Sequence, residues 1–290
     1  MALTLAEGAK LSNDMLLQGV VETIVKESPV LRALPFIEIV GNGLTYNQEN
    51  ALPSIDFYDV GDTWTESTPT FTQKTANLKI MGGDADVDNF LKATRSNLQD
   101  LEAAVVELKA KALRNKFEDT FIYGDASASP KQFDGLRKLI PGGQVVVAGA
   151  NGAPLTLDLL DSAIDLNRGN PGMLIMSKKA NRKLNSLLQA QQRFVDTMEV
   201  KGGFRVQVYN GIPIFRSIWV SDTQTQGTAS NATDIYILDT SAVWIGDLTP
   251  LRMLPLPQKS SQGSELDIDE DLVLVLANDI KASRLAGVTL

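Results

Sequence analysis

The longest regular pattern of apolar and polar positions in this chain runs from Ser96 to Tyr123. Ser96 and Gln99 have the spacing of a capping box at a helix start, and Gly124 follows the last turn, where glycine can adopt a left-handed conformation. The pattern predicts one uninterrupted helix over 97–123, roughly 40 Å long, which suits a plate-like subunit better than a compact enzyme. Between these ends, apolar residues recur at steps of three and four positions, as on one helix face: Leu98, Leu101, Val105, Leu108 and Ala112.

A shorter helical pattern lies near the N-terminus. Apolar residues recur through 5–28 at helical spacing, and Pro29 ends the pattern. We expect residues 1–40 to form an N-terminal arm that packs either on its own chain or across a neighbour.

The segment 41–83 is dominated by Thr, Asn, Ser, Asp and Gly, with few large apolar residues. Its β-favouring residues predict a long two-stranded hairpin that turns within 59–69 and continues through Leu78 and Ile80. An isolated two-stranded ribbon buries too little surface to offset its ordering entropy. We therefore predict that it borrows a surface from its own chain or, as we favour, from another. A polar ribbon would offer strand edges and hydrogen bonds rather than an apolar patch.

From Gln144 the pattern becomes α/β, with short apolar runs between helical segments. Pro213 predicts a strand near a sheet edge, and 223–233 is expected to be an exposed loop. Further strands are expected at 234–238 and, as a continuous apolar run, at 272–276. The other predicted elements are a helix over 157–166, a buried strand over 173–176, a helix capped by Ser177, and a hairpin of 204–209 and 212–215 around Asn210-Gly211.

Composition excludes several kinds of chemistry. The 290 residues contain no Cys and no His, which excludes disulfides, thiolate nucleophiles, Ser-His-Asp triads and the usual zinc ligands. The net charge is −8 and no basic stripe is visible, so general nucleic-acid binding is not expected. No apolar run is long enough for a membrane span, and the N-terminus lacks the basic region of a signal peptide. We expect a protein made in the cytoplasm that does not bind membranes.

Two acidic repeats are candidate metal sites. Asp84, Asp86 and Asp88 have the spacing that begins an EF-hand loop, but Asn89 and Arg95 stand where Gly and Glu are needed. The second repeat, at 267, 269 and 271, alternates with apolar residues and predicts a strand with one solvated face.

No phosphate-binding glycine loop is present. Ser177-Lys178-Lys179 fits a helix N-cap better than a Ser/Lys catalytic pair. We therefore predict no catalytic, cofactor-binding or metal-binding residues and no cofactor, and we expect that the protein is not an enzyme.

The order of these parts resembles the major capsid proteins of tailed bacteriophages, which have the HK97-like fold. The resemblance covers nearly the whole chain and is sharpest from the helix end FEDTFIYGD through GDASASPKQFDGL. IPIFRSIWV and IYILDTSAVWIGD are similar to a strand pair and a later strand of that family.

The resemblance implies an α+β fold of five parts. These are an N-terminal arm (1–40), an extended β-hairpin or E-loop (41–83), a peripheral domain with the long spine helix (84–143), an α/β axial domain (144–233) and strands that return to the peripheral sheet (234–290). Implied assembly contacts lie on the E-loop at Tyr58, Trp64, Phe71 and Lys74. Some members join a Lys of this region to an Asn of a neighbour; Lys74, Lys79 and Asn278 are the candidates here.

The implied function is a structural capsid protein that assembles, as hexamers and pentamers, into the icosahedral head of a phage. The head would enclose DNA without sequence-specific binding, and the protein would reside in the virion. Implied partners are a separate scaffolding protein, a portal and a decoration protein. Two alternatives stay open. One is an encapsulin-like compartment of the same fold; the other is a His-free carboxylate enzyme or binding module, which would need a deep pocket with shifted acid pKa values.

Overall fold

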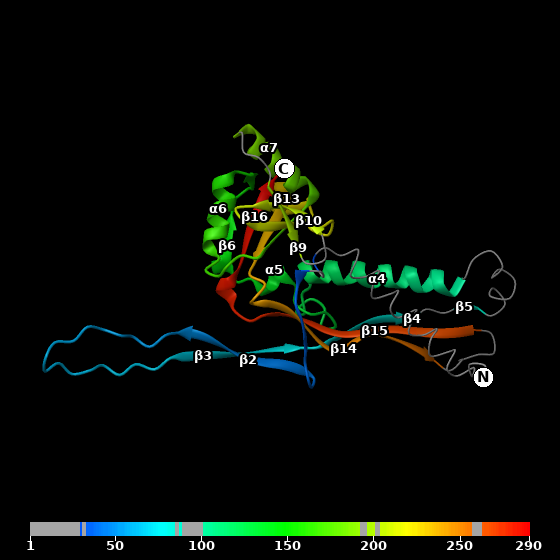
Figure 1. The fold of residues 1–290 in the computed structure, drawn as a ribbon, viewed down its shortest axis with the longest axis horizontal. Coiled ribbons are helices and arrows are strands. Elements are labelled where there is room, and N and C mark those ends of the chain that lie inside the picture. The colour runs from blue at the N-terminus through cyan, green and yellow to red at the C-terminus, as the bar shows by residue number, and fades with distance from the viewer. Residues whose placement is uncertain are drawn as a thin grey trace.

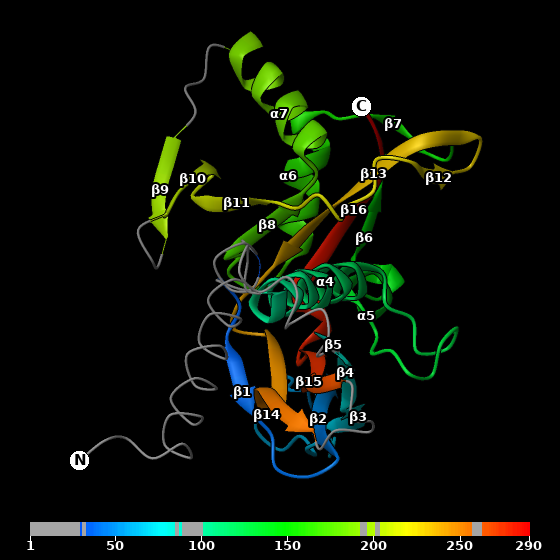
Figure 2. The same cartoon turned by 90° about the vertical axis from the view of Figure 1, so that its right-hand side faces the viewer.

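The computed structural model describes residues 30, 33–84, 87–88, 101–191, 196–200, 204–256 and 263–290. The predicted helix over 5–28, the capping box at 96–99 and Asp86 lie outside these residues. The described chain forms a five-stranded sheet, a nine-stranded sheet and a two-stranded hairpin. Helix α4 (Leu101–Tyr123) lies between the two larger sheets, and the hairpin projects from the side of the body (Figures 1 and 2).

The long helix is present, but it buries a different stripe from the one predicted. Leu108 is 65% exposed and Ala112 is also exposed. The sequence carries two overlapping apolar stripes, and the one that ends in the stacked rings of Phe117 and Phe121, 5.9 Å apart, turns toward the core. The buried residues of α4 that form this stripe are Val106, Ala110, Leu113, Phe117 and Phe121.

The helix ends by close backbone packing rather than by a left-handed glycine. Gly124 is not among the residues with positive φ. Its N–H bonds to the Thr120 carbonyl at 2.7 Å, and the N–H of Gly135 donates to the Gly124 carbonyl at 2.9 Å. A Cβ on Gly124 would overlap the carbonyl oxygens of Thr120 and Phe133, and a Cβ on Gly135 would overlap Gly124 itself. The short helix α5 (Leu136–Leu139) then begins.

The five-stranded sheet has the order β1-β14-β15-β4, with β5 paired to the far end of β15. Strand β1 is parallel to β14, and the other pairings are antiparallel. The buried side chains Ile245, Ile268 and Leu272 belong to the same core as the buried face of α4. The strands are β1 (Phe36–Glu38), β4 (Lys79–Asp84), β5 (Val87–Asp88), β14 (Val243–Leu256) and β15 (Gly263–Leu276).

The nine-stranded sheet has the order β6-β16-β13-β8-β11-β10-β9, with β12 paired to β13 and β7 to β16. The short helices η1 (Gly142–Gln144) and η2 (Asp279–Lys281) precede its strands β6 and β16. The strands are β6 (Val145–Val147), β7 (Ala153–Pro154), β8 (Met173–Met176), β9 (Asp196–Val200), β10 (Phe204–Tyr209), β11 (Ile212–Arg216), β12 (Gln224–Gln226), β13 (Ala229–Leu238) and β16 (Ala282–Thr289).

Each face of this sheet is covered by different helices. On strand β8, Met173 and Ile175 pack into the core that contains α4, whereas Leu174 and Met176 pack against α6 (Leu157–Leu166) and α7 (Lys178–Ala190). Because successive side chains of a strand point to opposite faces, this continuous apolar run needs cover on both sides. The bounds predicted for α6, β8 and the start of α7 are confirmed.

The C-terminal strands differ from the expectation that the chain after residue 234 returns to the peripheral sheet. Strands β14 and β15 do join the five-stranded sheet, but β13 and β16 lie inside the nine-stranded sheet. The chain therefore crosses from one sheet to the other between β13 and β14 and crosses back between β15 and β16. A buried apolar strand pattern in the sequence does not say which of two sheets will contain the strand.

Two smaller predictions about the nine-stranded sheet were wrong. Pro213 does not mark an edge, because β11 lies between β8 and β10. Pairing with β8 begins only at Ile214, so the missing proline N–H removes no bond of that ladder. The expected loop at 223–233 contains β12 and the start of β13, which pair as a hairpin.

Candidate assembly site

The hairpin consists of β2 (Gly43–Ala51) and β3 (Thr70–Asn77), which pair antiparallel from Gly43–Asn77 to Ala51–Thr70. The segment 52–69 connects them and extends far from the body (Figure 1). The predicted hairpin is confirmed, but its second arm is shorter than expected at both ends. Residues 63–69 are not in a strand, and the chain beyond Leu78 forms β4, which pairs with β15.

A few local contacts shape the tip. A tight turn forms where the Asp62 N–H donates to the Asp59 carbonyl at 3.1 Å, with Gly61 at φ 101°. The rings of Tyr58 and Trp64 stack at 5.3 Å with an interplanar angle of 15°, which holds the two arms of the tip together. These contacts give the tip a shape without giving it a core.

The tip and its approach expose large apolar side chains, which corrects the prediction of a polar ribbon without an apolar patch. Trp64 is 79% exposed and Phe71 is 63% exposed. We call the projecting hairpin, residues 43–77, the finger. Because long stretches of exposed apolar surface are rare on monomeric proteins and mark interaction sites, the finger is the strongest candidate site among the described residues. The exposed apolar residues are Leu52, Ile55, Phe57, Val60, Trp64 and Phe71.

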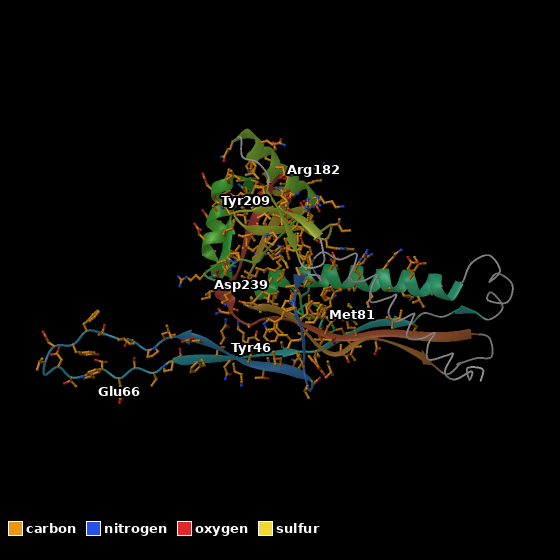
Figure 3. The ribbon with its side chains drawn as sticks, in the orientation of Figure 1. Tyr46, Glu66, Met81, Arg182, Tyr209 and Asp239 are labelled. Carbon is orange, nitrogen blue, oxygen red and sulfur yellow. The ribbon has the colours of Figure 1, made fainter. Side chains whose placement is uncertain are left out.

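The base of the hairpin is anchored to its own chain by a cross-strand pair, Tyr46 and Lys74. The Tyr46 hydroxyl donates to the Leu276 carbonyl at 3.0 Å, and the Lys74 ammonium contacts both oxygens of Asp279 at 2.8 and 2.7 Å. Burial, together with the Asp279 charge, raises the pKa of Tyr46. Figure 3 shows Tyr46 beneath the body and Glu66 near the far end of the finger. The hairpin is therefore fixed at one end and free at the other.

The structure separates the predicted contact residues into two groups. Trp64 and Phe71 are exposed on the finger and Tyr58 stacks on Trp64, whereas Lys74 lies at the base in an ion pair with its own chain. That these four residues contact another copy of the chain stays a prediction.

The candidates for a covalent cross-link also lie apart. Lys74 lies beside Asp279, the neighbour of Asn278, but the Lys79 ammonium donates to the Pro130 carbonyl at 2.7 Å. The Asn278 side chain accepts a bond from the Ile280 N–H at the start of η2. The cross-link stays a prediction.

Sequence reasoning missed two features of this site. Leu52, Ile55 and Val60 were not recognised, although apolar residues that recur through 52–71 without helical or strand periodicity were a usable signal. Asp279 was missed because it lies 205 residues from Lys74, and no local pattern joins the two.

A groove of about 700 Å³ runs beside the hairpin base. It is lined by four residues of β2, by Leu52 just after that strand, by the segment Ala277–Ile280 and by Arg168; the four residues of β2 are Asn47, Gln48, Glu49 and Ala51. Its lining carries charges of both signs, from Glu49, Asp279 and Arg168, and it is open rather than deep.

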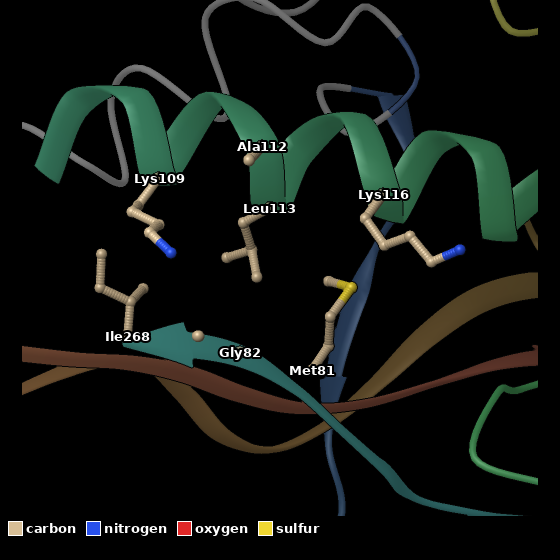
Figure 4. Close-up of a pocket in the computed structure, with 8 residues that line it drawn as sticks. Met81, Gly82, Lys109, Ala112, Leu113, Lys116 and Ile268 are labelled. Atoms are coloured by element: carbon tan, nitrogen blue, oxygen red, sulfur yellow. The ribbon is translucent and has the colours of Figure 1, made fainter. Parts of the chain in front are cut away.

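A smaller pocket of about 230 Å³ lies between α4 and the five-stranded sheet (Figure 4). Leu113, Met81 and Ile268 form its apolar part, and the chains of Lys109 and Lys116 flank it. None of the described residues that line this pocket carries a carboxylate. Across the described residues, no group of three or more His, Cys, Asp or Glu side chains is placed to hold a metal ion.

One carboxyl group is strongly shifted, that of Glu270, which does not itself line either hollow although its cross-strand partner Met81 lines the smaller pocket. Burial, with the Asp247 carboxylate adding to it, raises the pKa of Glu270 to about 7. Glu270 pairs across the strands with Met81 within the five-stranded sheet, so its environment is that of a sheet face packed by neighbours. In the described part of the chain, no helix has the length and apolar character needed to cross a bilayer.

Comparison with known proteins agrees with this architecture. The model of the SU10 major capsid protein family matches residues 9–289. A search of curated protein sequences finds no match.

Three similar solved structures illustrate the likeness. The SrpI encapsulin of Synechococcus elongatus PCC 7942 has a TM-score of 0.71 at 16% identity, over 90% of this chain and 87% of that one. The capsid of a native GTA particle scores 0.67 at 13% identity, over 92% and 90%. A structure of Mycobacterium phage Bobi scores 0.64 at 15% identity, over 89% and 90%. The expected HK97-like, α+β fold is confirmed.

Proposed function

Since the chain belongs to the SU10 major capsid protein family, we propose that many copies of it assemble into the closed, icosahedral head of a tailed phage. The observation that supports this most directly is the finger, which carries exposed apolar side chains into solvent while only its base is anchored. Its role is structural and we assign it no catalytic residue.

If the finger packed on a second copy of the chain, its exposed apolar side chains would be buried. Fully burying a large apolar side chain contributes about 1.5–3 kcal/mol, so six of them would supply on the order of 10 kcal/mol before the costs of association. Each copy would use its finger once and receive a finger once, and such head-to-tail contacts close into rings. On the family resemblance we propose that these rings are hexamers and pentamers, and numerous contacts per copy would hold the shell together.

The enclosed cargo would be DNA held without sequence-specific contacts, because a chain of net charge −8 gains little from binding phosphates. We propose the virion as the site of the mature protein and the host cytoplasm as the site of its synthesis. A separate scaffolding protein, a portal and a decoration protein are proposed as partners on the family resemblance alone.

Electron microscopy of the purified protein, with and without co-expressed scaffolding protein, tests the proposal. We expect closed particles, and we expect a variant lacking Asp59–Pro69 to remain a folded monomer that forms none. A matched control replaces Ser127, an exposed residue of the loop after α4, with alanine and should assemble normally. A wild-type chain that stays monomeric under all of these conditions would contradict the proposal.

An encapsulin-like compartment is the second candidate, because the SrpI shell protein has a similar fold. The two functions differ in contents. Particles purified from the native source should contain DNA if the chain forms a phage head, and a cargo protein without DNA if it forms a compartment.

A further inference from the structure

The two helices on the outer face of the nine-stranded sheet carry opposite charges. Helix α6 contains three aspartates and no Lys or Arg, whereas α7 contains four cationic residues and no Asp or Glu. Packing in the core accounts for the apolar side of each helix, which carries Leu160 and Ala163 on α6 and Leu184 on α7. The charges lie on the sides that the core does not use.

The acidic side of α6 is available to a partner. Asp158 and Asp165, seven positions apart and therefore on one side of the helix, are both exposed. The aspartate between them, Asp161, is already used, because it accepts bonds from the Tyr209 hydroxyl at 2.7 Å and the Asn210 amide at 3.2 Å.

The basic side of α7 is also available. Lys178 and Arg182, four positions apart on one side of the helix, are both exposed, and Arg216 lies exposed on β11 where it pairs with Met176, just before α7. Lys179 has a partner of its own, since its ammonium lies 3.8 Å from Asp222. Both helices lie entirely within the described residues, and no ion pair joins one to the other in this chain.

The two charged sides face different directions. Helix α6 lies on the side of the upper body toward which the finger extends, and Arg182 lies on the opposite side (Figures 1 and 3). In a head-to-tail ring every copy presents one side to the copy ahead and the other side to the copy behind. A copy that sends its finger forward would therefore also present α6 to the next copy, which would present α7 in return.

Resting on the proposed shell function, we propose that Asp158 and Asp165 of α6 form an electrostatic interface with Lys178 and Arg182 of α7 in the neighbouring copy of the same ring. The partner is a second copy of this chain. Complementary charges at such an interface set the direction and register of the contact and reject wrong pairings, in addition to any gain in affinity.

Charge-swap variants of the full chain test the interface under the conditions in which the wild type forms particles. One variant carries Asp158→Lys and Asp165→Lys, a second carries Lys178→Asp and Arg182→Asp, and a third carries all four changes. We expect each double variant to lower the particle yield by about tenfold or more, because like charges would meet across the ring. The fourfold variant should recover most of the yield. Lys131→Glu, in the exposed loop after α4, is the matched control for a change of charge and should assemble like the wild type.

Thermal melting of each monomer separates folding from assembly. Should the double lysine variant melt at a lower temperature because Asp158 stabilises the first turn of α6, Asp158→Asn with Asp165→Asn replaces it. About a threefold loss of yield is then expected, because attraction is removed without repulsion. The interface is contradicted if folded double variants assemble like the wild type, or if the fourfold variant is no better than either double variant. A wild type that never forms particles would instead contradict the proposed function.

Discussion

The finger and the nine-stranded sheet are both built from strands, yet they reach stability in opposite ways. All four residues of β8 are fully buried, because helices cover both faces of the sheet and strands flank both edges. In β3, by contrast, most residues are exposed, and the hairpin meets the body only near its base, where Tyr46 and Lys74 bond to it and Leu44 and Ala76 pack against the core. A strand in the sheet is stabilised by its own chain, whereas the finger carries apolar side chains that its own chain does not cover. This difference separates the residues that fold the subunit from those available to join it to others.

The sharpest test of this comparison is to truncate one large apolar side chain in each region to alanine. Leu174→Ala in β8 should lower the free energy of unfolding of the monomer by about 3 kcal/mol, because it leaves a cavity in a closed core. Trp64→Ala on the finger should change it by less than about 0.5 kcal/mol, as expected for an exposed site. Urea denaturation of both monomers measures the two values, and equal costs would show that the finger is part of the folding core.

The junction between the long helix and the sheets should be nearly as sensitive. Gly135→Ala should cost about 2 kcal/mol or more, because its Cβ would overlap the Thr120 carbonyl and the Gly124 backbone. Gly143→Ala is the matched control, since a Cβ there meets nothing within 4 Å. Melting temperatures of the two variants provide the measurement, and a Gly135 variant as stable as the control would refute the close-packing account of this turn.

The five-stranded sheet should show a pH dependence that neither the finger nor the nine-stranded sheet shares. Glu270 has a pKa of about 7 in the folded chain, above the ordinary value of 4.5 for a glutamate, so the folded state holds its proton more tightly than the unfolded state. Stability from this group is full below about pH 4.5, falls as the pH rises toward 7, and stays lower above it.

Glu270→Gln removes this titration. We expect the variant to be more stable than the wild type at pH 8 by about 2 kcal/mol, and this advantage should shrink toward pH 5. Denaturation at both pH values measures it, with Glu107→Gln on the exposed side of α4 as the control. A difference that does not vary with pH would mean that the carboxyl group titrates normally.

The smallest effect is expected at the anchor itself. Lys74→Met removes a partly exposed ion pair, which should lower overall stability by less than about 1 kcal/mol. Its local effect should be larger, because the finger loses one of its two side-chain anchors. Hydrogen exchange of the amides in 43–51 should speed up by about fivefold relative to Lys111→Met, which breaks an exposed pair within α4. Unchanged exchange would show that the Lys74 ion pair does not hold the base in place.

Much of the local structure was predictable because the signals are local. The N-caps of α6 and α7 are Thr156 and Ser177, whose side chains accept bonds from N–H groups three residues ahead. Asn210 and Gly211 have φ values of 49° and 82°, the conformation that a two-residue hairpin demands. In each case a few neighbouring residues carry the whole physical requirement.

The finger itself was predictable and its surface was not. Composition alone indicates a ribbon that cannot bury itself, and a protruding hairpin is what the structure contains. Its apolar character was underestimated because each exposed residue is surrounded by polar neighbours in the sequence, and only the folded hairpin shows that no other part of the chain covers them.

The sequence by itself determined the elements: a long helix, a capped α/β segment, a ribbon without a core, and a chain without His or Cys chemistry. Only the tertiary structure decided which stripe of α4 is buried, which sheet receives β13 and β16, and that Lys74 meets Asp279. These outcomes depend on contacts between segments up to 205 residues apart, where the choice among several apolar or charged partners follows from how whole elements pack together. Periodicity fixes which face of an element is apolar, but the shape of the assembled core selects its neighbour.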